Sequence, residues 1–209
     1  PISILFIVLR IPLVRLIFGA SQFDWQATVL TGRTLSYFSI SLFAQALIYL
    51  LSRGFYALHD TKTPLVIGFI TTFLMIVLGF IFIFVYHLGI ESIALAFSIG
   101  SILNFIIMFI GLDIKVGGFP RKDFFLSLSK ILIATFFTAF ALYIPIKLLD
   151  QLVFDTTKTV NLILLTGISS FVGLSLYLFL TWLFNVKEAN MLVHLFIRIG
   201  DWRQILKKS

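Results

Sequence analysis

The sequence contains no cysteine and few acidic residues. Its 209 residues include 9 Asp and Glu, 3 His and 16 Lys and Arg. The lack of cysteine excludes disulfides, thiolate nucleophiles and cysteine metal sites. The histidines (His59, His87 and His194) show no ligand spacing, so we expect no metal site and no cofactor. Most acidic residues lie in predicted loops and form no carboxylate pair inside an apolar segment, so we expect no catalytic site and no enzyme.

Long hydrophobic runs dominate what is present. Hydrophobic residues make up 60% of the chain, and the mean hydropathy is +1.09. Apolar segments occur at 2–19, 33–58, 64–86, 89–112, 124–148 and 160–185. Unpaired backbone groups are not tolerated in hydrocarbon and the runs do not alternate like barrel strands, so each should be a helix. We predict an all-α, polytopic transmembrane bundle of about six spans.

The positive charges predict how the bundle is oriented. Lys and Arg gather in the 59–63 turn, in the 113–123 loop and after residue 186, which the positive-inside rule places in the cytoplasm together with the C-terminus. Arg10 and Arg15 then lie toward the outer face. The net charge of +7 favours anionic lipid headgroups as partners. No basic surface interleaved with aromatic residues suggests a nucleic acid.

The two ends of the chain carry further expectations. Residue 1 is Pro and leads directly into an apolar run without signal-peptide features, so we expect a fragment whose N-terminal part is missing. At the other end, "NMLVHLFIRIGDWRQILKK" spaces apolar residues by three or four with basic residues among them. This pattern predicts that 187–209 is an amphipathic tail on the cytoplasmic leaflet, with an ordinary frayed tail as the alternative.

A line of polar side chains runs along the second segment. Successive members are 4, 4, 4, 3 and 4 residues apart, which places them on one side of a helix. They are Tyr37, Ser41, Gln45, Tyr49, Ser52 and Tyr56. Such a line is costly against lipid, so it should face either a neighbouring helix, through interhelical hydrogen bonds, or a substrate pathway. Arg53 lies at its inner end, and Asn104 is the one amide deep in the fourth segment.

Small residues repeat along the other segments. Ser92, Ala96, Gly100 and Asn104 recur every four residues, and Gly68, Thr72 and Gly79 do so approximately. Such stripes are typical of close helix packing.

The stretch "SRGFYALHDTKTPLV" (52–66) gathers several charges between two apolar runs. Asp60 or Thr61 can cap the next helix, and Pro64 suits the first turn because no N–H is needed there. Arg53 can reach headgroups or an anionic substrate from this position. We interpret residues Asp60, Thr61, Lys62, Thr63 and Pro64 as a tight cytoplasmic hinge, with a merely well-capped turn as the alternative.

These residues resemble a known family. "RGFYALHDTKTP" resembles the signature turn of the MurJ/MviN lipid II flippases, within the multidrug/oligosaccharidyl-lipid/polysaccharide flippase superfamily, where it joins the tenth and eleventh of fourteen spans. "LRIPLVRLIFGASQFD" resembles the end of the ninth span and the following loop, and "LGIESIALAFSIGSILNFIIMFIGL" resembles the twelfth. The resemblance implies that 1–112 contains spans nine to twelve, the first truncated, and that 124–186 contains spans thirteen and fourteen.

The resemblance also implies a function. The whole protein should move lipid II across a bacterial cytoplasmic membrane by alternating access, as a monomer, with a polyprenyl-pyrophosphate-linked glycan and membrane lipids as partners. Segments 124–148 and 160–185 should help to form a groove for the polyprenyl tail. The positions that bind sodium in some members correspond to Met75, Gly79 and Phe97, none of which offers a suitable side-chain oxygen.

Three other functions stay open from the residues. A related flippase could export another polyprenyl-linked glycan with the same fold. A membrane prenyl- or glycosyltransferase would need acidic metal ligands at a leaflet surface, which the sequence does not offer. A purely structural membrane subunit is the third.

Overall fold

The computed structural model contains helices and, within the described residues, no strand. The structure describes residues 1–19, 24–118, 121–152, 159–184 and 186, with only the backbone described at 121–125, 144–152 and 159. The helices are α1 (Ile2–Val8), α2 (Arg10–Phe18), α3 (Trp25–Ala57), α4 (Lys62–Phe80), the π-helix η1 (Ile81–Val85), α5 (Ser92–Val116), α6 (Arg121–Leu152) and α7 (Thr159–Leu183). The tail predicted for 187–209 lies outside the described residues.

Five helices of the described chain are long and apolar enough to cross a membrane. They are α3, α4 together with η1, α5, α6 and α7. The predicted all-α, polytopic bundle is therefore confirmed.

The first apolar segment is broken, contrary to the single helix predicted for 2–19. α1 ends at Val8, and α2 begins at Arg10 after Leu9, which has φ −89° and ψ 12°. Pro12 explains the break, because it has no N–H to donate to the Val8 carbonyl and its ring would clash there. The guanidinium of Arg10 donates instead to the carbonyl of Ile7 at 3.1 Å, which satisfies one of the carbonyls exposed at the end of α1.

The second helix begins earlier than the apolar run at 33–58 predicted. α3 starts at Trp25, where the carboxylate of Asp24 accepts from the Trp25 N–H at 2.7 Å. The hydroxyl of Thr28 donates to the Asp24 carbonyl at 3.0 Å. Because the first turns are held by polar groups of this kind, the helix extends beyond its apolar part.

The connection between α5 and α6 is shorter than the loop predicted at 113–123. α5 continues to Val116, and α6 begins at Arg121.

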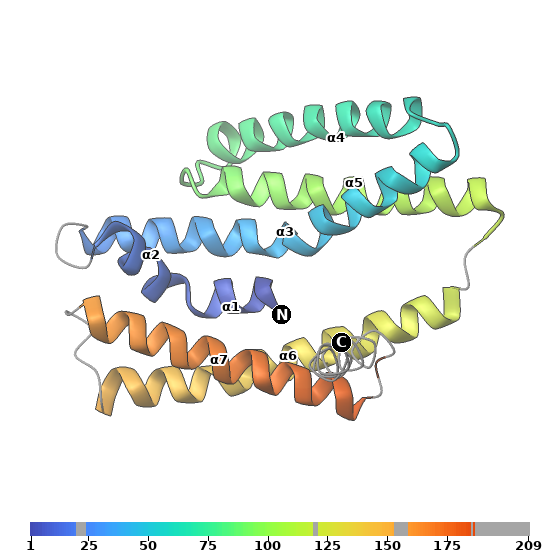
Figure 1. Cartoon of the computed structure of the whole chain (residues 1–209). Helices are drawn as coiled ribbons and strands as arrows, with labels where there is room; N and C mark the ends of the chain where they lie inside the picture. Colours follow the sequence, from blue (N-terminus) through green and yellow to red (C-terminus); the bar gives the residue numbers. More distant parts are fainter. Residues whose placement is uncertain (20–23, 119–120, 153–158, 185, 187–209) are drawn as a thin grey trace, which may run out of the picture.

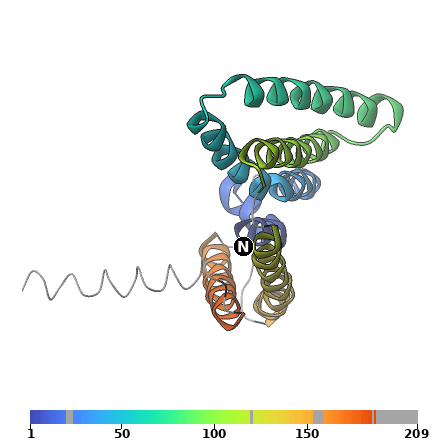
Figure 2. The ribbon, with the colours of Figure 1, turned by 90° about the vertical axis from the view of Figure 1, so that its right-hand side faces the viewer.

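α3 is the central helix of the arrangement. It packs against α5 on one side and against α1 and α2 on the other (Figure 1). α4 lies against α5, farthest from α6 and α7, which form an antiparallel pair that touches α1 and α2 (Figures 1 and 2). Two apolar clusters tie these layers together. Leu51 and Phe55 pack with Met108 and Leu112 between α3 and α5, while Leu5, Leu9 and Leu142 join the first segment to α6.

Small residues let α4 and α5 approach closely. A Cβ added to Gly100 would lie 2.2 Å from Cγ of Met75, and one added to Gly79 would lie 4.0 Å from Cβ of Ala96. The stripe predicted on α5 is buried at Ser92, Ala96 and Gly100. On α4, Gly79 of the predicted stripe faces α5, but the buried hydroxyl belongs to Thr71, whereas Thr72 of the stripe is exposed.

Candidate functional site

The half of the polar line nearer the start of α3 is turned into the protein. Ser41 is fully buried and Gln45 is half-buried. The amide Nε2 of Gln45 donates to Oγ of Ser41 at 2.9 Å, and that hydroxyl donates to the carbonyl of Phe38 at 2.8 Å. These bonds run along α3 itself, so the pair is preorganised on one helix and leaves the amide oxygen of Gln45 available to another group.

One hydrogen bond from this region crosses between helices. The hydroxyl of Ser98 on α5 donates to the backbone carbonyl of Tyr37 on α3. Tyr37 is half-buried, and the neighbouring rings of Phe38 and Phe97 meet edge to face at 5.3 Å. Tyr37, Ser41 and Gln45 are therefore at least partly covered by protein, as expected for polar groups in a spanning helix.

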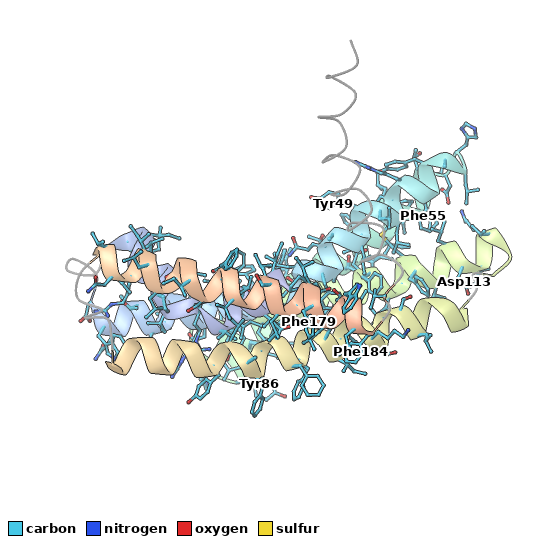
Figure 3. The ribbon with its side chains drawn as sticks, turned by 60° about the horizontal axis from the view of Figure 1, so that its bottom comes forward. Tyr49, Phe55, Tyr86, Asp113, Phe179 and Phe184 are labelled. Carbon is cyan, nitrogen blue, oxygen red and sulfur yellow. The ribbon has the colours of Figure 1, made fainter. Side chains whose placement is uncertain are left out.

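The half of the line nearer the end of α3 is more open. Tyr49 is 74% exposed and Tyr56 is 53% exposed. Ser52 is half-buried and donates to the Ile48 carbonyl at 2.8 Å, and Arg53 is exposed. Phe55, farther along α3 than Tyr49, is by contrast fully buried (Figure 3). It lies near the end of α3 that is close to Asp113 of α5. The line predicted as a unit thus divides into a covered half and an open half.

Asn104 lies on α5, one turn after Gly100 and one turn before Met108. Met75 of α4 lies against Gly100, and Met108 belongs to the apolar cluster against which Ile67 of α4 packs. The hydroxyl of Thr71 donates to the carbonyls of Ile67 and Gly68, at 2.9 and 3.1 Å. Within the described part of the chain, Oδ1 of Asn104 is buried and accepts no hydrogen bond.

The turn between α3 and α4 is fastened by its own residues. The carboxylate Oδ1 of Asp60 accepts from the backbone N–H groups of Lys62 and Thr63, each at 3.1 Å. Asp60, rather than Thr61, therefore caps α4, and Pro64 is buried in its first turn. His59 adopts φ +57°, and the next N–H, that of Asp60, returns to the Phe55 carbonyl at 3.0 Å. This closes the end of α3 in the manner of a Schellman motif.

A residue that the sequence analysis did not single out joins this turn to α5. The ammonium of Lys115 bonds to Oδ2 of Asp60, and it lies 3.2 Å from Oγ1 of Thr63 and 5.6 Å from the centre of the Phe55 ring. The hydrogen bond from Lys115, together with those from Thr63, lowers the pKa of Asp60 below its ordinary value of 3.8. Lys115 follows Asp60 by 55 residues, so spacing in the sequence gave no signal for the pair.

No metal centre is evident in the part of the chain that is described. Among those residues, no group of three or more His, Asp or Glu side chains is placed to hold an ion. At the three positions compared with sodium-binding relatives, Met75 lies against Gly100, Gly79 lies beside Ala96, and Phe97 contacts Phe38.

Comparison with known proteins decides the family. Residues 1–165 match the family described as Lipid II flippase MurJ. The chain belongs to the MurJ lipid II flippase family. The matched region includes α1 to α5, all of α6 and the beginning of α7. It therefore contains the polar line of α3, Asn104 and the turn at Asp60.

Individual MurJ relatives agree with this assignment. The chain is 30% identical over 148 residues to a probable lipid II flippase MurJ from Buchnera aphidicola subsp. Schizaphis graminum, which covers 68% of this chain and 28% of the relative. It is 32% identical over 101 residues to the lipid II flippase MurJ of Burkholderia cenocepacia, and this match covers 48% of this chain and 19% of the relative. For the lipid II flippase MurJ of Thermosipho africanus the identity is 29% over 127 residues, and the match covers 60% of this chain and 26% of the relative. The chain thus spans less than a third of the length of each of these relatives.

Proposed function

We propose that this chain is part of a lipid II flippase, a transporter rather than a catalyst. In this proposal, the protein moves a lipid-linked peptidoglycan precursor from the inner to the outer leaflet of a bacterial cytoplasmic membrane by alternating access. The observation that carries the proposal is the match to the MurJ family over residues 1–165. The hydrogen bond between the buried Ser41 and the half-buried Gln45 supports it, because a bilayer-spanning helix keeps polar side chains where they have a partner or a pathway.

The substrate is, in this proposal, a polyprenyl-pyrophosphate-linked glycan that contacts the polar line of α3. Arg53 is exposed close to the α3–α4 turn, so its guanidinium is available to a pyrophosphate. The exposed rings of Tyr49 and Tyr56 offer stacking surfaces for sugar on either side of it. Gln45 and Ser41 continue the polar path toward the middle of the helix. Asn104 of α5 belongs to the same proposed pathway, but its Oδ1 is buried and not open to the substrate in this conformation.

The polyprenyl tail lies, in the same proposal, along α6 and α7. Both helices expose large apolar side chains over the described part of their length. On α6 these include Phe136, Phe137 and Phe140, and on α7 they include Phe171 and Phe179. Such surfaces suit a long hydrocarbon chain as well as ordinary lipid.

The hinge role proposed for Asp60 to Pro64 rests on the contacts of the turn. Asp60 caps α4 and binds Lys115 of α5 at once, so α3, α4 and α5 are fastened together at one end. A group of helices held in this way can move as one body during a transport cycle. We place this end and the C-terminus in the cytoplasm, on the basis of the positive charges, and we propose that the whole protein works as a monomer.

Loss of function in cells tests the proposed path. Arg53→Ala and Gln45→Leu, made in the whole protein, should each lower the plating efficiency of flippase-depleted cells by roughly tenfold or more, because each removes a polar contact to substrate. Matched changes elsewhere on α3 serve as controls. Arg33→Ala and Gln26→Leu alter exposed residues near its other end and should leave growth near the wild-type level.

Protein levels in the membrane must be equal for all four variants. Full rescue by both Arg53→Ala and Gln45→Leu would contradict the roles proposed for these residues. Binding of labelled lipid II to the purified whole protein, with another polyprenyl-linked glycan as competitor, identifies the substrate. Stronger binding of the competitor would favour an exporter of that glycan instead.

A further inference from the structure

A cavity lies at the end of the bundle opposite the Asp60 turn. Its volume is about 480 Å³, and it is formed where α1, α2 and the start of α3 meet α6 and α7. These helix ends gather on the left of Figure 1. The chemistry of the lining comes from Arg10, Arg15, Trp25 and Tyr143, set against an apolar wall that includes Leu162 and Leu165. The volume is within the range of small-ligand sites.

The two arginines bring positive charge into this lining, and no described lining residue carries a carboxylate. Neither Arg10 nor Arg15 forms an ion pair with an acidic residue among the described residues, and none of the lining residues is acidic. Arg10 uses one donor on the Ile7 carbonyl, and the guanidinium of Arg15 lies 5.7 Å from the centre of the Trp25 ring. Since each guanidinium has five donors, most of them remain for an anion.

The apolar part of the lining indicates what kind of anion fits. Ile7, Val8 and Ile11 of the lining are half-buried and keep apolar surface for a ligand, whereas Leu162 and Leu165 are almost completely buried. A free phosphate would gain nothing from this wall, whereas the acyl and glycerol parts of a lipid would. Trp and Tyr side chains favour the level of lipid headgroups, because their rings are apolar and their polar atoms need partners.

The position of the charges supports the same ligand. On the orientation predicted from the other Lys and Arg residues, Arg10 and Arg15 lie on the outer side, where positive charge is disfavoured. An anionic headgroup would compensate for them. It would also stabilise the contact between the broken first segment and the α6–α7 pair, which both line the cavity.

The geometry points to a binding site for an anionic phospholipid, in which Arg10 and Arg15 hold the headgroup phosphate and the apolar lining of α1 and α2 receives the start of an acyl chain. Arginine suits this role because its planar donors match the oxygens of a phosphate in pairs. The site is separate from the polar line of α3, and the inference does not depend on the proposed flippase function.

Trp25 lines the cavity and is 58% exposed, so it can report a lipid bound there. The chain has three tryptophans, and Trp182→Phe with Trp202→Phe leaves Trp25 alone. This chain is placed in two kinds of phosphatidylcholine bilayer disc. One kind contains brominated phosphatidylglycerol, and the other contains the same fraction of brominated phosphatidylcholine. Bromine quenches tryptophan only at close range. We expect the apparent affinity for the brominated phosphatidylglycerol to be roughly fivefold higher than that for the brominated phosphatidylcholine. This ratio is the effect of about one favourable charge contact at a membrane surface.

Substitution of the arginines should remove this preference. In Arg10→Gln/Arg15→Gln the ratio of the two affinities is expected to fall to about one. Arg33→Gln, a matched change of an exposed arginine outside the cavity, should keep the higher ratio. Circular dichroism reports whether the double variant folds. If it does not, the single Arg10→Gln and Arg15→Gln variants are measured, and each is expected to lower the ratio.

Three results would overturn the inference. One is equal quenching of Trp25 by the two lipids in the chain with both arginines present. Another is a preference that survives in the folded double variant, or in both single variants. The third is loss of the preference when inorganic phosphate is added in excess at constant ionic strength, which would identify a free anion, and not a lipid, as the ligand.

Discussion

Asp60 shows how much a single residue can contribute at a helix junction. One carboxylate oxygen caps α4 through the N–H groups of Lys62 and Thr63, while the other binds the ammonium of Lys115 on α5. The capping part of this arrangement was predicted from the residue type and from Pro64 nearby. The ion pair was not predictable, because nothing in the spacing of the two residues brings them together.

The pair predicts how the turn responds to acid. The pKa of Asp60 is lowered in the folded protein, so its contribution to stability is complete above the ordinary value of 3.8 and declines as the pH falls toward the lower folded pKa. The junction should therefore be insensitive to pH over the physiological range. Lys115→Met removes the largest cause of the shift, and we expect it to raise the pKa of Asp60 toward 3.8.

The titration can be followed directly by NMR. The carboxyl carbon of Asp60, labelled with ¹³C, reports its pKa in the wild-type chain and in the variant. Lys62→Met is the matched control, because Lys62 is exposed and gives Asp60 only a backbone N–H. An unchanged pKa in Lys115→Met would show that the ion pair does not hold this carboxylate.

At the scale of whole elements, the existence of the helices followed from composition, but their ends did not. The break at Leu9 depends on Pro12. Proline is also common in the first turn of a helix, so Pro12 by itself did not predict that the apolar run 2–19 would be divided into two helices. α3 begins at Trp25 because Asp24 and Thr28 bond to the backbone there, although the surrounding residues are too polar to read as a span. Local polar bonds of this kind are not visible in hydropathy.

The packing of α4 against α5 predicts a contrast between two glycines. Gly100→Ile should destabilise the chain by about 1–3 kcal/mol, because its Cβ would overlap Met75 in the closest part of the contact. Gly167→Ile is the matched control on α7. Nothing lies within 4 Å of its Cβ position, so the larger side chain projects into open space.

Thermal unfolding in detergent measures both variants. The melting temperature of Gly100→Ile should fall by several degrees, whereas that of Gly167→Ile should stay close to the wild-type value. Equal melting temperatures for the two variants would mean that the contact between α4 and α5 is looser than the structure indicates.

At the scale of the whole molecule, the arrangement joins three layers through the first segment. α1 and α2 lie between α3 and the α6–α7 pair, and the cavity with Arg10 and Arg15 forms at that junction (Figure 1). The polar line of α3 was recognisable from its spacing. Its division into a buried half at Ser41 and an exposed half at Tyr49 follows from which neighbours cover each part, which a single sequence does not specify.

The central claim is that the protein containing this chain carries lipid II across a bilayer. The most direct measurement reconstitutes the whole protein into vesicles with fluorescent lipid II and follows the fraction that a membrane-impermeant quencher reaches with time. The account predicts faster exchange between leaflets than in protein-free vesicles, and slower exchange with Arg53→Ala and Gln45→Leu than with Arg33→Ala. Exchange no faster than in protein-free vesicles, by folded wild-type protein under conditions that support growth, would contradict it.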